Sequence, residues 1–551
     1  MSGTHLVVGS GASAAMVALT LASHPDQHVT VLDLGGRLET ERRAALQQLA
    51  GRDEASWDPV ALGAVTAAPA PRGTRGVPQK RTYGSDYPFR DLGQTTGLRS
   101  GQPGTNLDVV SSAYGGFTNV WGAQAMPFSR STFDGWPIAW HEMERHYRAT
   151  LDEVSLAAED DDLADTFPLL NPRSRLPPLG PRAEAVLQRY DAHRERVRGL
   201  GLTVGRARLA LRADACTRCG LCMTGCPHEL IYSAAQTMDR VRRLPNVTYR
   251  DRLLVERIGQ VGDQAVARCR DLATGEHAEF RADRLFVGAG AVGTTQLVLG
   301  SSAAPPSRVE MAESRQFVVP FLSARAVEDP RRPGARDFTL NQFNVLVSFD
   351  EEDRDTSHVH CYPYNPAYLG ALPAPLRHPA ASRAATSVLR RLTVGFGYLP
   401  SWASPRITVT ARRGRSGGLP ELDLSAPDTH RPPMLGATLR RLIRAAPALD
   451  LWPLPTHVLL SGAGKSYHFG GTFPHRREGA AADGTSTDRW GRLPEWDRVH
   501  LVDGSVLPTI ASTTFTLTVM ANAHRIATEV LAGAGTGPVR PVVELTTECS
   551  G

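Results

Sequence analysis

One short segment near the N-terminus restricts the fold more than any other part of the sequence. Residues 9–14 read Gly-Ser-Gly-Ala-Ser-Ala, a G-x-G-x-x-A pattern. A stretch that fits a β-strand precedes this turn, and an apolar stretch that fits a helix follows it through Leu21. A second strand-like stretch ends at Asp33, close to the spacing of about 20 residues that is typical of a dinucleotide-binding unit. The segment therefore predicts an α/β domain with a parallel sheet.

The residue types in this turn suit a pyrophosphate. Gly9 permits the tight turn, Gly11 lets the backbone approach the phosphates, and Ala14 lets helix and strand pack closely. The N-terminus of the helix carries partial positive charge toward the same group, and Asp33 can accept hydrogen bonds from a ribose. We expect a bound dinucleotide, which this pattern alone does not divide between NAD(P) and FAD. The turn residues expected to bind it are Gly9, Gly11, Ala12, Ser13 and Ala14.

Two further glycine-rich segments suit a flat or anionic ligand. Residues 114–124 contain Gly116, Thr118, Asn119 and Gly122, although this segment taken alone also fits an ordinary buried turn. Residues 288–294 contain Gly290, follow a short strand at 284–287 and open a helix that runs through Leu299. Both segments are expected to help bind the cofactor.

Four of the seven cysteines lie within eleven residues. Cys216, Cys219, Cys222 and Cys226 form the pattern C-x2-C-x2-C-x3-C followed by proline, which is the spacing of bacterial ferredoxin cluster binding. The pattern does not match the paired knuckles of a structural zinc site, although zinc and packed thiols stay open as alternatives. No second motif exists, so a 4Fe-4S cluster with four ligands, which we favour, and a three-iron cluster with three ligands are both compatible with the sequence. Cys269, Cys361 and Cys549 are isolated and are expected to be structural.

Near the C-terminus, His468 precedes a glycine turn, Gly470-Gly471. Some 30 residues later comes Asp503-Gly504-Ser505, and then Thr514-Phe515-Thr516 opens a helix expected over 516–531. A lone histidine is usually structural, but its position beside a glycine turn and the Asp-Gly-Ser segment make His468 a candidate catalytic group.

Taken in order, these segments resemble those of the glucose–methanol–choline (GMC) family of flavoprotein oxidoreductases. The matching parts are Gly9–Ala14 with Asp33, the 115–122 loop, the 288–294 turn, and the stretch from His468 to Thr518. The cysteine segment continuing to Tyr232 is similar to the iron–sulfur subunits of bacterial FAD-dependent sugar dehydrogenases. The resemblance implies FAD rather than NAD, and oxidation of an alcohol or hemiacetal carbon.

The resemblance also implies roles for individual residues. Gly9, Gly11 and Asp33 would hold the FAD diphosphate and ribose, and Asn119 would lie near the isoalloxazine. The remaining residues expected at the flavin are Asp503, Gly504 and Thr516. His468 matches the family's catalytic base. The family usually has a second His or Asn where this chain has Thr514, so His468 would act alone or with help from Thr514, His475 or Asn522.

The rest of the chain fits a discontinuous FAD-binding Rossmann-like α/β domain with an inserted antiparallel substrate domain. We expect residues 1–302 and 457–535 to form the FAD-binding domain, 303–456 the substrate domain, and 536–551 a tail. The first part would carry the cysteine segment at 214–232 and irregular loop insertions at 40–110 and 155–182. A surface loop is expected at 371–387.

Composition excludes several classes of protein. The 61 basic and 56 acidic residues nearly balance, to a net charge of +5, which gives no argument for binding nucleic acid. The sequence contains no run of about 20 apolar residues, so no membrane span is predicted. The first residues carry no leader-like pattern, so we expect a cytoplasmic protein with reduced thiols.

These observations predict an FAD-dependent dehydrogenase that oxidises an alcohol or sugar hydroxyl, with His468 as base. The cluster would pass electrons to an external acceptor, for which an electron-acceptor protein is a candidate. Two alternatives stay open: an oxygen-using oxidase with a structural cysteine or zinc site, and a flavin–iron–sulfur electron carrier or redox sensor.

Overall fold

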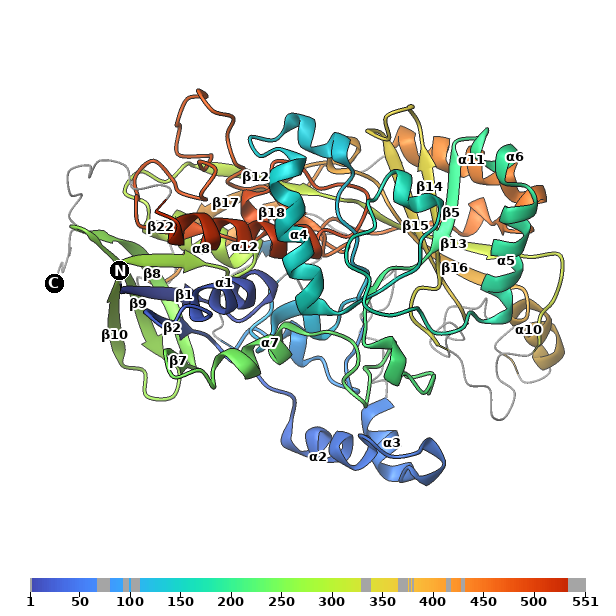
Figure 1. Cartoon of the computed structure of the whole chain (residues 1–551), viewed down its shortest axis with the longest axis horizontal. Coiled ribbons are helices and arrows are strands. Elements are labelled where there is room, and N and C mark those ends of the chain that lie inside the picture. The colour runs from blue at the N-terminus through green and yellow to red at the C-terminus, as the bar shows by residue number, and fades with distance from the viewer. Residues whose placement is uncertain are drawn as a thin grey trace.

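The computed structural model describes residues 2–66, 80–92, 99–100, 110–328, 338–364, 381–412, 418–427 and 432–533, together with 375 and 378. A five-stranded parallel sheet, a seven-stranded antiparallel sheet and a mixed five-stranded sheet form the body. In Figure 1 the parallel sheet lies toward the left and the antiparallel sheet toward the right. The tail expected at 536–551, which includes Cys549, lies outside the described residues.

The parallel sheet has the order β22-β11-β1-β2-β7. Its strands are β1 (Gly3–Val8), β2 (Gln27–Leu32), β7 (Val247–Arg250), β11 (Arg284–Val287) and β22 (Val499–Leu501). Because side chains alternate along a strand, Val7 and Leu6 belong to different cores on opposite faces of this sheet. The strands and turns expected at the two glycine motifs are confirmed.

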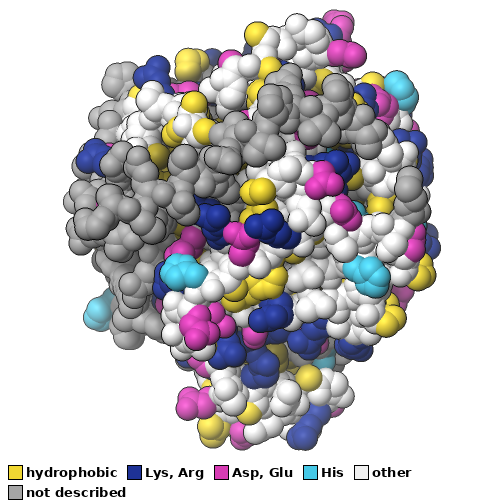
Figure 2. All heavy atoms as spheres, turned by 90° about the vertical axis from the view of Figure 1, so that its left-hand side faces the viewer, with side chains coloured by type: hydrophobic (Ala, Val, Ile, Leu, Met, Phe, Trp, Pro, Cys, Tyr) yellow, Lys and Arg dark blue, Asp and Glu magenta, His cyan; other side chains and the backbone are white. Residues whose placement is uncertain are grey.

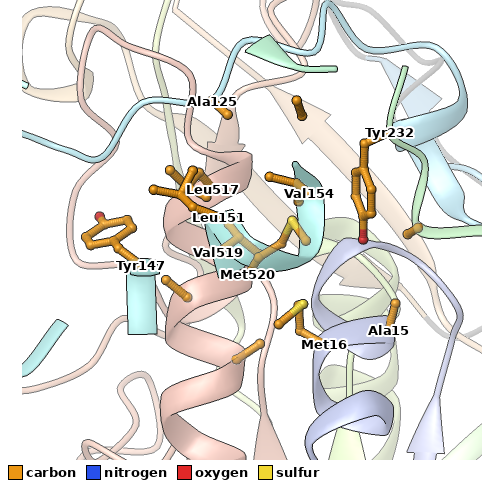
Figure 3. Close-up of a cluster of buried hydrophobic side chains, with 14 of the residues drawn as sticks. Ala15, Met16, Ala125, Tyr147, Leu151, Val154, Tyr232, Leu517, Val519 and Met520 are labelled. Atoms are coloured by element: carbon orange, nitrogen blue, oxygen red, sulfur yellow. The ribbon is translucent and has the colours of Figure 1, made fainter. Parts of the chain in front are cut away.

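Four helices cover one face of the parallel sheet. They are α1 (Ala12–Ala22), α4 (Trp140–Val154), α7 (Ala234–Val241) and α12 (Thr516–Leu531). Figure 3 shows Met16 of α1, Leu151 of α4, and Leu517 and Met520 of α12 meeting in this core. The last helix begins and ends where the sequence predicted.

The other face packs against a small antiparallel sheet and one helix. The elements are β8 (Leu253–Val261), β9 (Gln264–Asp271), β10 (His277–Ala282) and α8 (Ala291–Ser301). The mixed sheet, of order β21-β12-β17-β18-β3, adjoins this core. Its strands are β3 (Arg99–Ser100), β12 (Arg308–Glu313), β17 (Ile407–Arg412), β18 (Glu421–Ser425) and β21 (Phe469–Gly470).

The antiparallel sheet has the order β19-β13-β16-β15-β14-β5, and β20 also pairs with β13. Its strands are β5 (Leu202–Arg206), β13 (Gln316–Leu322), β14 (Phe343–Ser348), β15 (Thr356–Tyr362), β16 (Leu392–Tyr398), β19 (Trp452–Pro453) and β20 (Leu459–Leu460). One face is apolar and packs against α5 (Pro181–Ala192), α6 (Arg194–Arg198) and α11 (Pro433–Leu449). The strand β5 reaches this sheet from well before residue 303.

Two expected loop regions contain helices. Residues 40–110 were expected to be irregular, but α2 (Thr40–Leu49) and α3 (Pro59–Thr66) form a pair with its own small core. Figure 1 shows this pair projecting below the body. Helix α10 (Ser382–Leu389) occupies the end of the loop expected at 371–387, most of which lies outside the described residues. These helices are short, with 10, 8 and 8 residues, so the composition of the longer segments around them hid them from the sequence.

The remaining short strands are β4 (Leu156–Ala157) and β6 (Leu209–Ala210), which pair with each other. Among the described helices, none combines the length and the apolar character that a bilayer crossing requires. Figure 2 shows basic and acidic side chains interspersed on one face of the molecule, in keeping with the small net charge.

Candidate functional site

The turn between β1 and α1 has the geometry that a diphosphate requires. Gly9 has a φ of 96°, and a Cβ there would lie 2.7 Å from the carbonyl oxygen of Gly288. Gly11 is the N-cap of α1 and no side chain caps this end, so the first backbone N–H groups of the helix, those of Ala12 and Ser13 included, are not used by a capping side chain. An uncapped helix N-terminus attracts an anion.

Close packing of this turn against β11 depends on small residues. A Cβ on Gly288 would lie 3.0 Å from the Cβ of Ala14. The expected role of Ala14 in close helix–strand packing is therefore seen in the contacts. The ligand role of these turn residues stays a prediction.

Asp33 is 7% exposed and lies at the end of β2, as expected. The hydroxyl groups of Ser10 and Tyr249 donate to its Oδ2 atom, at 2.6 and 2.8 Å. Burial raises the pKa of Asp33, and these two hydrogen bonds oppose that rise. The structure thus assigns protein partners to one carboxylate oxygen, which the sequence did not predict.

The second glycine turn leads into a second uncapped helix. Gly290 is the N-cap of α8, has a φ of 78°, and has no atom within 4 Å of the position where a Cβ would stand. Asp503 follows β22 and lies beside this end: Thr294 donates to its Oδ2 at 2.5 Å and the N–H of Ser505 to its Oδ1 at 2.9 Å. Burial raises the pKa of Asp503. Asp503 therefore fastens the start of α8 to the end of β22.

The 115–122 loop lies against the dinucleotide turn. A Cβ on Gly116 would be 3.2 Å from the Cα of Gly11, so two glycine backbones approach each other directly. At the other end of the loop, a Cβ on Gly122 would lie 2.8 Å from the hydroxyl of Tyr362 in β15. This loop thus connects the parallel sheet with the antiparallel sheet.

Two polar side chains hold the shape of the loop. Asn119 donates to the carbonyl oxygens of Tyr114 and Gly116, at 2.9 and 2.8 Å, and accepts from Ser233. Thr118 accepts from the N–H of Ala234 at the start of α7. Both side chains are used to fix the loop, so their nearness to a flavin ring stays a prediction.

These features fit an FAD molecule. Two helix N-termini without side-chain caps and a glycine backbone surface provide donors for a diphosphate and room for a flat ring. A Cβ at Gly9 or Gly116 would press against the backbone of Gly288 or Gly11, so these turns can approach one another only as glycines.

His468 is fixed by backbone contacts just before β21. Its carbonyl oxygen accepts from the N–H of Ser314, and its own N–H donates to the hydroxyl of Ser466. Ser466 in turn donates to the buried carboxylate of Glu313 at 2.8 Å. The backbone on both sides of the imidazole is therefore held by β12.

The His468 ring is enclosed by aromatic side chains. It stacks on Tyr398 with ring centroids 4.6 Å apart and packs against Phe515 at 5.3 Å. Burial lowers its pKa to about 4, so the ring is neutral at pH 7. Its Nδ1 atom is buried without a hydrogen-bond partner within the described part of the chain. A neutral, buried imidazole with an unused nitrogen can accept a proton.

The other predicted C-terminal residues have different partners. The hydroxyl of Thr514 donates to the carbonyl oxygen of Gln124 at 2.9 Å. Asn522 hydrogen-bonds the Nε2 atom of His475, at 3.1 Å, and accepts from Arg525. Thus Asn522 and His475 are brought together, and among the described contacts neither residue touches His468.

Two further predicted residues lie close to this region. Thr516 is the first residue of α12 and is half-buried. Gly504 accepts a hydrogen bond at its carbonyl oxygen from the N–H of Gly471, and a Cβ on Gly504 would lie 3.1 Å from the ring of Phe515.

The sequence analysis missed two buried histidines of strand β15. His358 and His360 lie two residues apart and therefore share one face of the sheet. The Nε2 atom of His360 is 3.3 Å from Nδ1 of His358, and the His360 ring packs on Tyr398 at 5.0 Å. The signal that would have revealed them is the period-two placement of two histidines in a strand that is buried at every position.

The four clustered cysteines lie in a loop after Ala213–Ala215. Positive φ values at Arg218, Gly220 and Gly225 curl its backbone. Burial raises the pKa of Cys216 to about 11 and that of Cys219 to about 12. Negative charge on Cys222 and Cys226 would raise both pKa values further.

The spacing of these thiols does not match a zinc site. Within the described residues, the only three metal-binding side chains whose ligand atoms lie within 4.8 Å of one another are Glu54, Cys219 and His228. A single zinc ion would hold its thiolates closer than an iron–sulfur cube does. The donor set fits a cluster better than it fits zinc, and both stay predictions.

Residues 80–83 connect the cysteine loop with the 115–122 loop. The Tyr83 hydroxyl donates to the carbonyl oxygen of Cys226 at 2.9 Å, and the Tyr83 N–H donates to Thr224. On the other side, Thr82 donates to the carbonyl oxygen of Asn119 at 2.8 Å. The two loops are thus neighbours, which sequence alone does not reveal.

No family model matches this sequence, and no curated protein does. Among solved structures, pyridoxine 4-oxidase from Mesorbium loti is similar with a TM-score of 0.58 and 16% identity, over 96% of this chain and 99% of that one. A formate oxidase from Aspergillus oryzae is similar with a TM-score of 0.59 and 14% identity, over 97% of this chain and 99% of that one.

A third similar structure is an FAD-dependent oxidoreductase from Chaetomium thermophilum, with a TM-score of 0.57 and 14% identity over 96% and 99% of the two chains. All three similarities extend over almost the full length of both partners. The chain therefore has the fold of these oxidoreductases, and the α/β fold class expected from its resemblance to the GMC family is confirmed.

Proposed function

We propose that this protein is an FAD-dependent oxidoreductase that oxidises an alcohol-type hydroxyl, with His468 as the base. The observation that carries the proposal is the neutral, aromatic-enclosed His468 beside Phe515 at the entry to α12. The similar structures include an FAD-dependent oxidoreductase, a pyridoxine oxidase and a formate oxidase, which supports the same class of reaction.

The dinucleotide turn with Asp33 and the N-terminus of α8 would hold the cofactor. The residues proposed to bind it are Gly9, Gly11, Ala12, Ser13, Ala14, Asp33, Gly116, Thr118, Asn119, Gly122, Gly290, Asp503, Gly504 and Thr516. FAD, when bound, would supply the acceptor for the hydride of the substrate carbon. The protein's part is to orient that carbon, exclude water and remove the hydroxyl proton.

His468 would perform the proton removal. Because the ring is neutral at pH 7, one nitrogen can accept the proton of a substrate hydroxyl. A positioned base of this kind accelerates a reaction by about 10²–10⁴-fold. The stacked Tyr398 and the packed Phe515 hold the ring in one orientation.

The cysteine loop would hold an iron–sulfur cluster, 4Fe-4S in our proposal, with Cys216, Cys219, Cys222 and Cys226 as ligands. Such a cluster would carry single electrons to an external acceptor, which favours a dehydrogenase. Support comes from the connection through Thr82 and Tyr83 between this loop and the 115–122 loop. A short separation between two redox groups is what electron transfer needs.

A second candidate is an oxidase that reduces oxygen, with the cysteines binding zinc or no metal. Two of the similar structures are named as oxidases, and this observation favours it. Peroxide production under air that matches substrate consumption would identify the oxidase, whereas slow oxygen use and fast reduction of an artificial acceptor would identify the dehydrogenase.

The test of the main proposal is anaerobic reduction of the purified flavoprotein by a panel of alcohols and sugars. His468→Asn should keep its FAD and lose bleaching by substrate, while light-driven reduction of its flavin stays normal. Equal bleaching of wild type and variant would remove His468 from the base role. A wild type that no alcohol reduces would instead favour an electron carrier or redox sensor.

Metal analysis of the same preparations tests the cluster. We expect iron and sulfide in wild type and their loss in Cys222→Ser. The matched control is Cys269→Ser, because Cys269 is buried in strand β9, away from the cysteine loop. Zinc without sulfide in wild type would overturn the cluster.

A further inference from the structure

The place of the family's second catalytic side chain is taken by Thr514, and its hydroxyl is already used. Thr514 donates to the carbonyl oxygen of Gln124, and Asn522 is used by His475 and Arg525. Within the described residues, Thr514 thus has no hydroxyl hydrogen left to donate to a substrate, and Asn522 is held by two other side chains. If the reacting hydroxyl has another protein partner, it comes from elsewhere in the fold.

The antiparallel sheet supplies the candidates. In β15 the side chains of Val359 and Cys361 join the apolar core on one face, so His358 and His360 lie on the other face. Residues paired across neighbouring strands share a face, and Tyr398 of β16 is paired with His358. The stacking of Tyr398 on His468 therefore shows that this polar face looks toward the catalytic base.

The face of the sheet that carries His358 and His360 also contacts the 115–122 loop and the residues that follow it. Asn344 of β14 is paired with His360 and accepts from the side chain of Gln124 at 2.9 Å. Gln124 follows directly on the 115–122 loop, and Gly122 in that loop lies against the hydroxyl of Tyr362. Residues beside His360 on this face thus contact both His468 and Gln124.

Three of the residues on or beside this sheet face carry a buried polar atom without a hydrogen-bond partner. The Nε2 atom of His358, the Oε1 atom of Gln124 and the Nδ1 atom of His468 are all buried and have no hydrogen-bond partner among the described residues. A buried polar atom without a partner costs about 1–3 kcal/mol, so each of these three atoms has hydrogen-bonding capacity left for a polar ligand.

The hydrogen bond between the two histidines defines what they can offer. Two neutral imidazoles that share one proton always keep one N–H and one bare nitrogen for other partners. Buried donors without a partner are rarer than buried acceptors without one. The favoured arrangement therefore leaves the bare nitrogen on His358 Nε2, which has no partner, and puts the free N–H on His360 Nδ1.

Resting on the proposed function, we propose that His360 is a catalytic residue whose ring N–H donates to the oxygen of the reacting hydroxyl, and that His358 fixes its tautomer. The hydroxyl proton passes to His468 while the C–H bond gives up its hydride, so negative charge grows on this oxygen before the carbonyl forms. A donor held at that position stabilises the growing charge. The imidazole of strand β15 would thereby replace the family's C-terminal His or Asn.

Burial and neighbouring charges support a neutral pair. Burial lowers the pKa of His358 to about 3 and that of His360 well below its usual value, and the charges of His358 and His468 lower the latter further. The buried guanidinium of Arg208 also lowers the pKa of His358. A neutral donor beside a neutral base leaves His468 free to accept the proton.

The experiment compares His360→Ala, His360→Asn and Cys361→Ala with wild type, all FAD-loaded. The probes are pyridoxine, benzyl alcohol and D-glucose in anaerobic stopped-flow reduction of the flavin. We expect His360→Ala to slow reduction by about 10²–10³-fold with an unchanged apparent affinity, because one donor to a developing negative charge is lost. His360→Asn should recover part of the rate, since its amide can donate.

Cys361→Ala is the matched control, because it changes the same strand on the opposite face, and its rate should equal that of wild type. A His360→Ala rate equal to wild type would overturn the inference, and so would a loss of affinity at an unchanged rate. Thermal melting and flavin content identify a variant that fails to fold, in which case His360→Asn decides.

A second readout does not need turnover. In the wild-type holoprotein labelled with 15N-histidine, His358 and His360 should stay neutral from pH 8 to pH 5 and share one proton. Protonation of either ring in this range would overturn the pair. If no probe alcohol reduces wild type, the proposed function fails, and this spectrum still decides whether the pair exists.

Discussion

Lys80 donates a hydrogen bond from its ammonium group to the carbonyl oxygen of Trp121, 2.7 Å away. This bond joins the 115–122 loop to the segment that contains Tyr83, which in turn contacts the cysteine loop. It is one of only two lysines in the chain. Burial lowers the pKa of Lys80 to about 8, and the charge of Cys222 acts in the opposite direction. In the described residues no carboxylate lies within ion-pair distance of Lys80, so the proposed cluster would be its negative neighbour.

We expect Lys80→Met to make the proposed cluster harder to reduce. A buried cation stabilises the more negative, reduced cluster, and its removal should lower the equilibrium constant for one-electron reduction about tenfold, or about 59 mV. A redox titration followed by paramagnetic resonance measures the change.

The other lysine provides the control for this prediction. Lys465 lies 5.7 Å over the ring of Tyr467, next to His468 in sequence rather than in the cysteine loop. Lys465→Met should leave the cluster potential unchanged. Equal potentials in wild type and Lys80→Met would show that the Lys80 charge does not reach the cluster.

Gly9→Ala should destabilise the protein and weaken FAD retention. Ala at a φ of 96° costs about 1–2 kcal/mol in conformation alone. The added Cβ would also lie 2.7 Å from a backbone oxygen of Gly288, which has little freedom to move. Chemical unfolding of the apoprotein and flavin release measure the two effects.

Gly262→Ala separates the conformational cost from the steric one. Gly262 has a φ of 60°, but no atom lies within 4 Å of its would-be Cβ. The Gly262→Ala variant should therefore be destabilised only by the conformational cost of Ala at a positive φ, and it should keep its FAD. If both variants lose the same free energy of unfolding, the contact with Gly288 carries no weight.

Short sequence patterns correctly predicted the turns and the helix whose form depends on residues that are neighbours in the sequence. The turn at Gly9, the second turn at Gly290 and the final helix at 516–531 follow from glycine positions and helical periodicity over short stretches. Helices α2 and α3 were missed because both are short and lie in a segment that is rich in Arg, Gly and Pro as a whole.

The candidate site shows more clearly which features short sequence patterns do not predict. His468 was found because a glycine turn marks it, but His360 needs the register of β14, β15 and β16 before it faces the same site. The sequence likewise gave no sign that Thr514 is bound to the carbonyl oxygen of Gln124. Contacts between distant segments decide such roles, and no local pattern encodes them.

The rate of flavin reduction should be independent of pH over the neutral range. Burial lowers the pKa of His468 to about 4, so the proton-accepting form is complete above about pH 5. The rate should fall only as the pH approaches 4, where the ring becomes charged. Stopped-flow reduction at pH 5–8 measures this, and a rate that falls through pH 6.5 would show a solvent-exposed base instead.

Acid should begin to destabilise the fold below about pH 6.5. This is a higher pH than the one at which proteins usually lose the interactions of their carboxylates. Burial lowers the pKa of several histidines to about 3 or 4: His146, His358, His468, His475 and His500. In the unfolded chain these rings bind protons near pH 6.5, whereas in the folded protein they do not, so the unfolded state gains protons first.

Stability is therefore complete above about pH 6.5 and decreases as the pH falls toward the folded-state pKa values. Each such ring contributes at most about 1.4 kcal/mol per pH unit. Melting temperatures at pH 8, 7, 6 and 5 should show a plateau and then a steep decrease. His500→Gln should reduce the slope by one ring's share, whereas His28→Gln, at an exposed position, should not. A flat melting temperature between pH 7 and pH 5 would mean that these histidines can be protonated without opening the fold.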